Sequence, residues 1–312
     1  MLDTINLSLT TLRAEALTSN LSGAREIINR ETGEMTWSGN LQNFRVWGGA
    51  GRLWLKGSLP KFYLGNNIET LTREETGQAI GKLSDALGEP LAEAEVFRLD
   101  IGRTFEVNRA PSDYWRDIIT PARMKRHEFG LETLTLYNRQ RAISFYDKQA
   151  ETHRAGAKPT ERAEAKRETS YLSHANLLRV EVQFKRRLRH ALGWRDIRAA
   201  TLSDAAFFER AVSEWAAIYF RLKRGRHVRL PEEIDVKAIL NWLAASRLQE
   251  IGVQEFLDVI EAERRGGRIN KGQAFRLRRK LIDLARLEAI AAESDAAREL
   301  DAKVRQAAAI CR

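Results

Sequence analysis

The polar and apolar residues of the chain alternate in several segments with the period of two that is typical of a β-strand with one buried face. Residues 141–148 form the most informative of these segments. Ile143 and Phe145 fall on one face, which we expect to pack against a core, and Tyr146 and Lys148 fall on the other. The pattern therefore predicts a strand that presents a phenol and an ammonium group on the side away from the core.

Two further segments, residues 96–102 and 178–184, show the same alternation of apolar and ionisable positions. Their polar faces carry Arg98, Asp100, Arg179, Glu181 and Gln183. If the three strands lie in one sheet, these charged groups come close to the tyrosine of the first segment. Spacing alone leaves two interpretations open, a reactive cluster and a set of Arg–carboxylate pairs on a solvated sheet face.

The remaining pattern of the first half predicts strands with interspersed helices. The first 64 residues are β-rich, with alternating runs separated by glycine-rich turns. Residues 72–87 predict a helix with Gly88 as its C-cap, and residues 111–119 predict a short helix that begins at a proline. A further strand is predicted near residues 131–137. This pattern favours an α+β domain built on an antiparallel sheet.

The second half of the chain has a different pattern. Residues 151–170 are polar, charged and low in complexity, which predicts a mobile excursion from the α+β domain. After about residue 200 apolar residues recur with helical spacing, and those from Leu277 to Leu300 predict one long terminal helix. We therefore divide the chain into an α+β domain, residues 1–195, and an all-helical C-terminal region, residues 200–312.

Composition points to a polyanionic partner. The chain has 312 residues, 52 of them Lys or Arg and 42 Asp or Glu, which gives a formal net charge of +10. This balance suits nucleic acid. The one cysteine, Cys311, excludes an internal disulfide, so a reducing cytoplasm is the expected location. No apolar run approaches the roughly 18 to 20 residues of a membrane span, and the first residues lack the pattern of a signal peptide.

Two clusters of basic residues are the expected contacts for such a partner. The first follows the third polar strand directly and comprises Lys185, Arg186 and Arg187. The second, residues 264–280, holds eight basic residues and no acidic ones. A helix–turn–helix pair with a basic second helix has this pattern, and it predicts contact with duplex or hairpin DNA. The phosphate contacts expected there are Arg276, Arg278 and Arg279.

The polar strand faces also carry candidate chemistry. A tyrosine beside a cation is suited to attack on a phosphodiester, because the cation favours the phenolate and neutralises phosphate charge. Tyr146 and Lys148 fit this description, although most tyrosines in strands serve only in packing. The chain has no P-loop and no pair of histidines separated by one hydrophobic residue. A divalent cation would therefore rest on carboxylates such as Asp100 and Glu181.

Several short blocks follow one another in an order that resembles a known family. The blocks are Met1–Asp3, Lys56–Lys61 with Gly65–Asn67, Arg98–Asp100, Glu132–Thr135, Arg141–Glu151, and Leu178–Glu181 followed by Gly193. In this order and spacing the chain resembles the gene II/gene X replication initiators of filamentous phages, which nick and rejoin origin DNA in rolling-circle replication. The resemblance covers residues 1 to about 195, which makes this part the expected origin-nicking domain.

The resemblance implies a nucleophile and a reaction. Tyr146 matches the nucleophile position of the family, with Lys148 and Glu151 following it. Attack on an origin phosphodiester would leave a 5′-phosphotyrosine and a free 3′-OH. Related plasmid initiators also carry a Tyr-Asp-Lys element, and their pattern leaves Tyr137 as a rival nucleophile.

The resemblance also implies a cofactor and partners. The expected cofactor is Mg²⁺ or Mn²⁺, with Asp100, Glu181 and Glu151 as its ligands. Phosphate contacts are expected from Arg98, Arg179, Lys56 and Lys61. The expected partners are duplex and single-stranded origin DNA and the host replicative helicase and polymerase in the bacterial cytoplasm. Assembly into a homo-oligomer on DNA is left open.

Two other functions compete with the nicking enzyme. The first is a non-catalytic DNA-binding regulator or repressor on the same fold. The second is a scaffold that binds single strands and uses Trp47, Trp54 and Tyr63 as stacking platforms. The presence of Tyr146 and Lys148 together with the carboxylates argues against the loss of catalysis.

Overall fold

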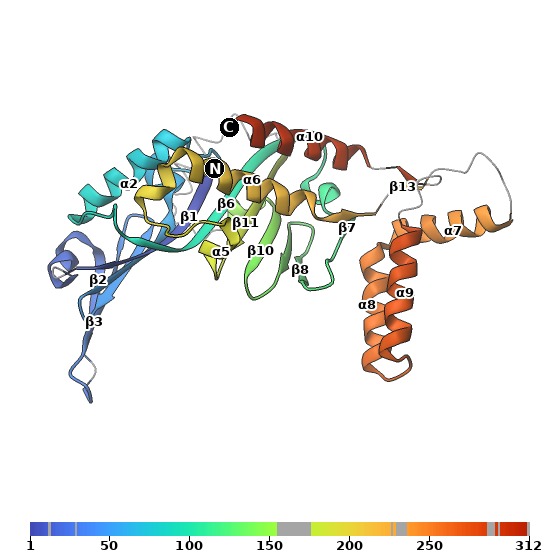
Figure 1. Cartoon of the computed structure of the whole chain (residues 1–312), viewed down its shortest axis with the longest axis horizontal. Helices are drawn as coiled ribbons and strands as arrows, with labels where there is room; N and C mark the ends of the chain where they lie inside the picture. Colours follow the sequence, from blue (N-terminus) through green and yellow to red (C-terminus); the bar gives the residue numbers. More distant parts are fainter. Residues whose placement is uncertain are drawn as a thin grey trace.

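The centre of the protein is one large antiparallel sheet (Figure 1). The computed structural model describes the chain except for residues 12–13, 29, 155–175, 226, 229–235, 286–290, 293 and 311–312. The sheet has ten strands in the order β2-β3-β4-β5-β1-β6-β11-β10-β9-β8. They are β1 (Leu2–Thr10), β2 (Ser22–Ile28), β3 (Met35–Leu41), β4 (Phe44–Gly49), β5 (Arg52–Ser58), β6 (Glu95–Val107), β8 (Lys125–Phe129), β9 (Thr133–Tyr137), β10 (Arg141–Asp147) and β11 (Asn176–Phe184).

Helices and short connecting elements accompany the sheet. The helices are α1 (Leu59–Leu64), α2 (Arg73–Leu87), α3 (Lys148–Arg154), α5 (Leu188–Leu192), α6 (Ala205–Phe220), α7 (Val236–Ile251), α8 (Val253–Arg265), α9 (Lys271–Leu284) and α10 (Asp295–Ile310). The 3₁₀ turns are η1 (Ala14–Asn20), η2 (Pro111–Tyr114) and η4 (Ala200–Ser203), and β7 (Ile118–Ile119), β12 (Lys223–Arg224), β13 (His227–Val228) and β14 (Ala291–Ala292) form two small sheets. The predicted α+β fold class with a helical C-terminal region is confirmed.

Local sequence signals explain α2, which confirms the helix predicted over 72–87. Thr72 accepts a hydrogen bond from the backbone of Glu75, whose side chain accepts one from the backbone of Thr72 in return. Gly88 ends the helix in the left-handed conformation, with a φ of 83°. The apolar stripe of the helix, which includes Leu83 and Leu87, is fully buried against the sheet.

The core lies between the sheet and helices α6 and α10. Ile143 and Phe145 of β10 are fully buried, as the alternation predicted. The indole N–H of Trp215 in α6 donates to the carbonyl oxygen of Val180 in β11 at 3.3 Å, and the ring of Tyr219 lies 6.2 Å from that of Phe145. Residues beyond 200 thus complete the core of the sheet, while the division of the chain at about residue 195 stays a prediction.

Two predicted helices differ from the structure. The short helix expected over 111–119 is a 3₁₀ turn, η2, followed by β7, because residues 118–119 pair with β12 from the distant segment after α6. The single long terminal helix is divided, since α9 ends at Leu284 and α10 begins at Asp295, with β14 between them. The predicted mobile excursion at 151–170 begins in α3, and its residues from 155 onward lie outside the described part of the chain.

Helices α7, α8 and α9 extend away from the body of the protein (Figure 1). The helices α8 and α9 lie side by side as a hairpin, joined by a turn that contains Gly266 and Gly267. Among the residues that the structure describes, no helix has both the length and the apolar character needed to cross a membrane.

Candidate functional site

The three predicted polar strands are neighbours in the centre of the sheet. Strand β11 lies between β6 and β10, and directly opposed residues on neighbouring strands share one side. Tyr146, Arg179 and Thr104 form one row across the three strands. Ser144, Glu181 and Gly102 form the next row. The prediction that these polar faces belong to one sheet is therefore confirmed.

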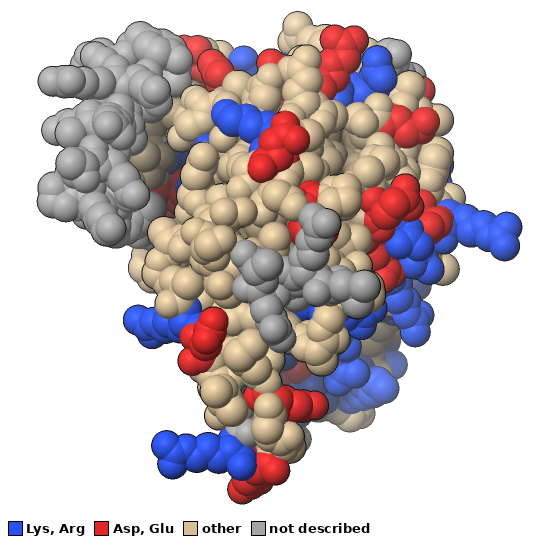
Figure 2. Space-filling model, turned by 90° about the vertical axis from the view of Figure 1, so that its left-hand side faces the viewer, with Lys and Arg blue, Asp and Glu red and all other residues tan. Residues whose placement is uncertain are grey.

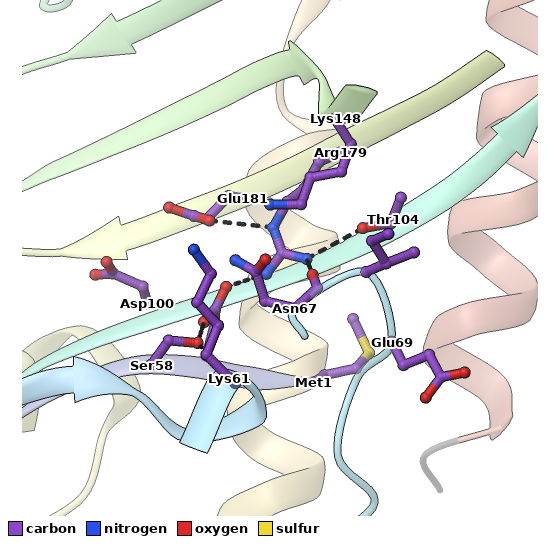
Figure 3. Close-up of polar contacts among 12 residues, drawn as sticks. Met1, Ser58, Lys61, Asn67, Glu69, Asp100, Thr104, Lys148, Arg179 and Glu181 are labelled. Carbon is purple, nitrogen blue, oxygen red and sulfur yellow. Dashed lines mark hydrogen bonds and ion pairs between the residues drawn. The ribbon is translucent and has the colours of Figure 1, made fainter. Parts of the chain in front are cut away.

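Arg179 lies at the centre of the cluster and has no exposed surface. Its Nη1 donates to the carbonyl oxygen of Asn67 at 2.9 Å and to the hydroxyl of Thr104 at 3.1 Å, as Figure 3 shows. Its Nε donates to Glu181 at 3.2 Å, and its Nη2 donates to Asp3. Burial alone would lower the pKa of Arg179, but the neighbouring acidic groups raise it above its usual value. The guanidinium therefore stays charged and holds two carboxylates in place.

Asp3 is a site residue that the alternation pattern did not identify. In regular pairing it would share the core side of β1 with Ile5. However, Leu2 pairs with Ile101 and Ile5 pairs with Leu99, so β1 contains one extra residue at this point. Such a bulge turns a side chain toward the other face of the sheet. Asp3 thereby reaches Arg179 and accepts a hydrogen bond from the hydroxyl of Ser58 at 2.5 Å.

Ser58 was also missed, and it connects the site to α1. Its hydroxyl oxygen accepts a hydrogen bond from the backbone N–H of Lys61 and so caps the helix. A serine followed by a proline two residues later is a recognisable helix start, which was the available signal. Figure 3 shows the side chains of Lys61, Asp100 and Glu181 on the same side of β6 and β11 as the contacts of Arg179.

The phenol of Tyr146 points to the carboxylate side of the cluster. Its hydroxyl donates to Oε2 of Glu181 at 3.1 Å. Burial raises the pKa of Tyr146 well above its usual value, and the negative charge of Glu181 raises it further, while Arg179 lowers it. The phenol is therefore protonated at neutral pH, and Glu181 is the group within reach that can take its proton.

Lys148 does not continue the strand of Tyr146 but begins α3. The carboxylate of Asp147 accepts hydrogen bonds from the backbone of Gln149 and Ala150 and thereby starts the helix. Lys148 is buried, and its Nζ lies 2.5 Å from Oε2 of Glu151 and 5.8 Å from the centre of the Tyr146 ring. Burial lowers the pKa of Lys148, with Glu151 acting in the opposite direction.

Asp100 forms a two-pronged ion pair with Arg98, with N–O distances of 3.0 and 2.7 Å. Burial nevertheless raises the pKa of Asp100 well above that of an ordinary carboxyl group, and the charges of Glu181 and Asp3 raise it further, against the lowering effect of Arg98. The carboxylates of Asp3, Asp100 and Glu181 thus lie close together, with Arg98 and Arg179 as their ion-pair partners.

The predicted metal ligands each have a cationic or phenolic partner. Glu151 pairs with Lys148, Asp100 with Arg98, and Glu181 with Arg179. Among the described residues, no three His, Cys, Asp or Glu side chains are grouped closely enough to hold a metal ion. The metal-binding roles of these carboxylates stay a prediction.

Comparison with known families decides what kind of protein carries this site. The model of one phage family, which describes the N-terminal part of the gene II replication-associated protein, matches residues 12–218. The matched residues include β6, β10, β11 and most of α6. The chain belongs to this family. No curated protein and no solved structure matches the chain.

Membership of this replication-associated family confirms the resemblance to the gene II replication initiators of filamentous phages. The protein is thus a phage-type replication-associated protein, and binding of origin DNA follows from that role. The family match extends into α6, which agrees with the packing of this helix on the sheet.

Tyr137, the rival nucleophile, lies apart from the carboxylate cluster of this replication-associated protein. It ends β9 opposite Ala142 of β10, and Nζ of Lys185 lies 5.6 Å from the centre of its ring. Arg186 and Arg187 follow Lys185 after the end of β11. The first basic cluster thus lies beside Tyr137, and the geometry favours Tyr146 as the residue with a proton acceptor at hand.

The second basic cluster of the replication-associated protein lies on the α8–α9 hairpin. Glu261 of α8 lies within ion-pair distance of Arg264, Arg265 and Arg278. Arg279 pairs with Asp283 at 4.0 Å. The two helices and the turn confirm the predicted pair of helices, although several of its cations are partly offset by acidic side chains outside residues 264–280.

Proposed function

We propose that this replication-associated protein nicks and rejoins origin DNA through a covalent phosphotyrosine intermediate. The hydrogen bond from the Tyr146 hydroxyl to Glu181 carries the proposal, because it places a proton acceptor on the attacking oxygen. In the forward step the phenolic oxygen forms a bond to the scissile phosphorus and the bond from phosphorus to O3′ breaks. The products are a 5′-phosphotyrosine and a free 3′-OH, and the reverse step rejoins the strand.

The proton transfers follow from the same geometry. The pKa of Tyr146 is raised, so the phenol does not ionise unaided at neutral pH and its proton passes to Glu181 during attack. The leaving O3′ needs a proton, and Lys148 is the ammonium group beside the tyrosine ring. A lowered pKa makes Lys148 a better acid than an exposed lysine.

Burial and hydrogen bonding distinguish positioning residues from those that face the substrate. Arg179 has no exposed surface and donates to Asp3, Glu181, Thr104 and the carbonyl oxygen of Asn67. This geometry favours a positioning role over the phosphate clamp that we expected. Lys61 on α1 and Lys56 on β5 are more exposed than Arg179, so they are better placed for phosphate contacts.

The carboxylates suit a hard divalent cation in their chemistry. Asp100 and Glu181 supply oxygen ligands from the neighbouring strands β6 and β11, and oxygen ligands are the ones that Mg²⁺ and Mn²⁺ prefer. We propose that these two residues hold Mg²⁺ or Mn²⁺. The ion would supply positive charge to the phosphate as charge develops on it. Glu151 would join them only by leaving Lys148.

We also propose the context in which the reaction takes place. The substrate is duplex origin DNA that becomes single-stranded, and the host replicative helicase and polymerase follow in the bacterial cytoplasm. Rejoining of the displaced strand uses either the free 3′-OH or a second protomer on the same DNA.

The test is incubation with a supercoiled plasmid that carries the replication origin, in the presence of Mg²⁺, followed by a denaturing gel. Wild-type protein should relax the plasmid and form a covalent protein–DNA adduct. Tyr146→Phe keeps the packing of the ring and removes the attacking oxygen, so it should bind origin DNA and form no adduct. Binding without nicking by the wild-type protein would favour the non-catalytic regulator.

A further inference from the structure

The sheet face that carries Tyr146 continues beyond the site across β1, β5 and β4. One row of directly opposed residues consists of Arg45, Lys56, Asn6 and Arg98. Arg98 binds Asp100 of the site. The next row consists of Ser38, Trp47, Trp54 and Ser8. We call the surface formed by Arg45, Trp47, Trp54 and Lys56 the outer track, and these rows make it continuous with the site.

The two tryptophans form a stacked aromatic pair on the outer track. Trp47 and Trp54 are directly opposed on β4 and β5, with ring centroids 6.4 Å apart and ring planes 9° from parallel. Both are only partly buried. The other side of the same strands is filled by fully buried Val46, Leu53 and Leu55. The core therefore does not use these indoles, and part of their surface remains open to a ligand.

The outer track also carries cations that no acidic side chain neutralises. Arg45 and Lys56 are exposed, and in the part of the chain that the structure describes neither forms an ion pair. Each lies two residues from an indole along its own strand, a separation of about 7 Å. The guanidinium carbon of Arg45 lies 6.0 Å from the centre of the Trp47 ring. Aromatic and cationic rows thus run beside each other across the same strands.

Charge is distributed unevenly at the end of the molecule where this part of the sheet lies. Figure 2 looks at this end and shows Lys and Arg side chains gathered along one side, with largely uncharged surface over much of the remainder. A polyanion that approaches from this end meets most of the visible positive charge along that side.

We propose that the outer track binds single-stranded DNA next to the scissile phosphate, with Trp47 and Trp54 stacked on nucleobases and Arg45 and Lys56 on backbone phosphates. The inference rests on the proposed nicking function, because the track continues from that site. Single strands suit it better than duplex, since only unpaired bases offer their faces to an indole. The parallel rows of rings and cations match a strand whose bases and phosphates lie side by side.

The test measures the affinity of the full chain for a fluorescein-labelled oligothymidine of about 20 nucleotides, a length that exceeds a typical single-strand site. Anisotropy is read in a Tyr146→Phe background that binds without cleaving. Trp47→Leu with Trp54→Leu should weaken binding by about 30-fold or more, because each stacked base contributes at least about a factor of five. Phe220→Leu is the matched control. This partly exposed aromatic residue lies on α6, which covers the opposite face of the sheet, and its replacement should leave the affinity unchanged.

A second pair of variants keeps the test independent of the tryptophans. Arg45→Gln with Lys56→Gln should lower the slope of log affinity against log salt by about 1.4, or about 0.7 for each single-strand phosphate contact. Unchanged affinity in the folded Trp variant, or unchanged slope here, would overturn the inference. Equal losses for a duplex of the same length would overturn the choice of single strands. Failure of the nicking proposal gives a different result. In that case the wild-type protein forms no adduct on the origin plasmid but still binds oligothymidine, and only the outer-track variants bind it more weakly.

Discussion

The change Gly102→Ala tests whether the tight packing of Arg179 and Glu181 sets the activity. Gly102 lies opposite Glu181 on β6, and a Cβ placed there would come within 3.2 Å of Nη2 of Arg179 and of Cβ and Cγ of Glu181. Ordinary contacts between heavy atoms lie near about 3.5–4.0 Å. The two side chains must therefore move by a few tenths of an ångström, and Arg179 is held by hydrogen bonds on all sides.

The expected cost follows from this displacement. Added volume in a packed region typically lowers the free energy of unfolding by about 1–3 kcal/mol. A shift of roughly 1 Å in a reacting group costs about 10²-fold in rate, so a shift of a few tenths should slow nicking by roughly three- to tenfold. Nicking is measured from the initial rate of relaxation of the origin plasmid, and stability from urea unfolding.

Gly81→Ala is the matched control, because a Cβ at Gly81 in α2 meets nothing within 4 Å. It should leave nicking unchanged and stabilise the protein by up to about 1 kcal/mol, since alanine favours a helix interior. Wild-type nicking and stability in Gly102→Ala would refute the conclusion that the close approach of β6 positions Arg179 and Glu181.

The remaining predictions concern the carboxylates and the α8–α9 hairpin. Asp100→Asn and Glu181→Gln should each slow nicking by about 10²-fold or more, while origin binding persists in a filter assay. Excess EDTA should stop nicking by the wild-type protein, and full activity in EDTA would exclude the metal. Changing Arg276, Arg278 and Arg279 to Gln should flatten the salt dependence of duplex affinity by up to about 2.7, and by less where Glu261 and Asp283 already offset these charges. Cleavage of a single-stranded origin oligonucleotide should change little, and an unchanged salt slope would mean that the hairpin does not contact phosphates.

The alternation of apolar and polar residues was enough to predict the strands of the site. Ile143 and Phe145 lie in the core and Tyr146 faces the other side because a strand has a fixed period of two. The same rule could not place Asp3, because one extra residue in β1 reverses the side to which it points. A bulge depends on the pairing of strands far apart in sequence, so local pattern does not reveal it.

Tertiary pairing explains the other differences. Residues 118–119 form a strand only because β12 lies beside them, and the C-terminal helical pattern is broken where β14 pairs with β13. Lys148 was expected on the strand face, yet Asp147 caps α3 and directs it toward Glu151. An aspartate just before a helical segment was the available signal, and the strand alternation concealed it.

The central claim is that the oxygen of Tyr146 attacks the scissile phosphate. The most direct test isolates the protein–DNA adduct, digests the DNA with nuclease and maps the modified tryptic peptide by mass spectrometry. Cleavage after Arg141 and Lys148 gives a peptide of residues 142–148 with Tyr146, and cleavage after Arg126 and Arg139 gives residues 127–139 with Tyr137. We predict a nucleotide phosphate on residues 142–148. A nucleotide on residues 127–139 instead would contradict the assignment and make Tyr137 the nucleophile.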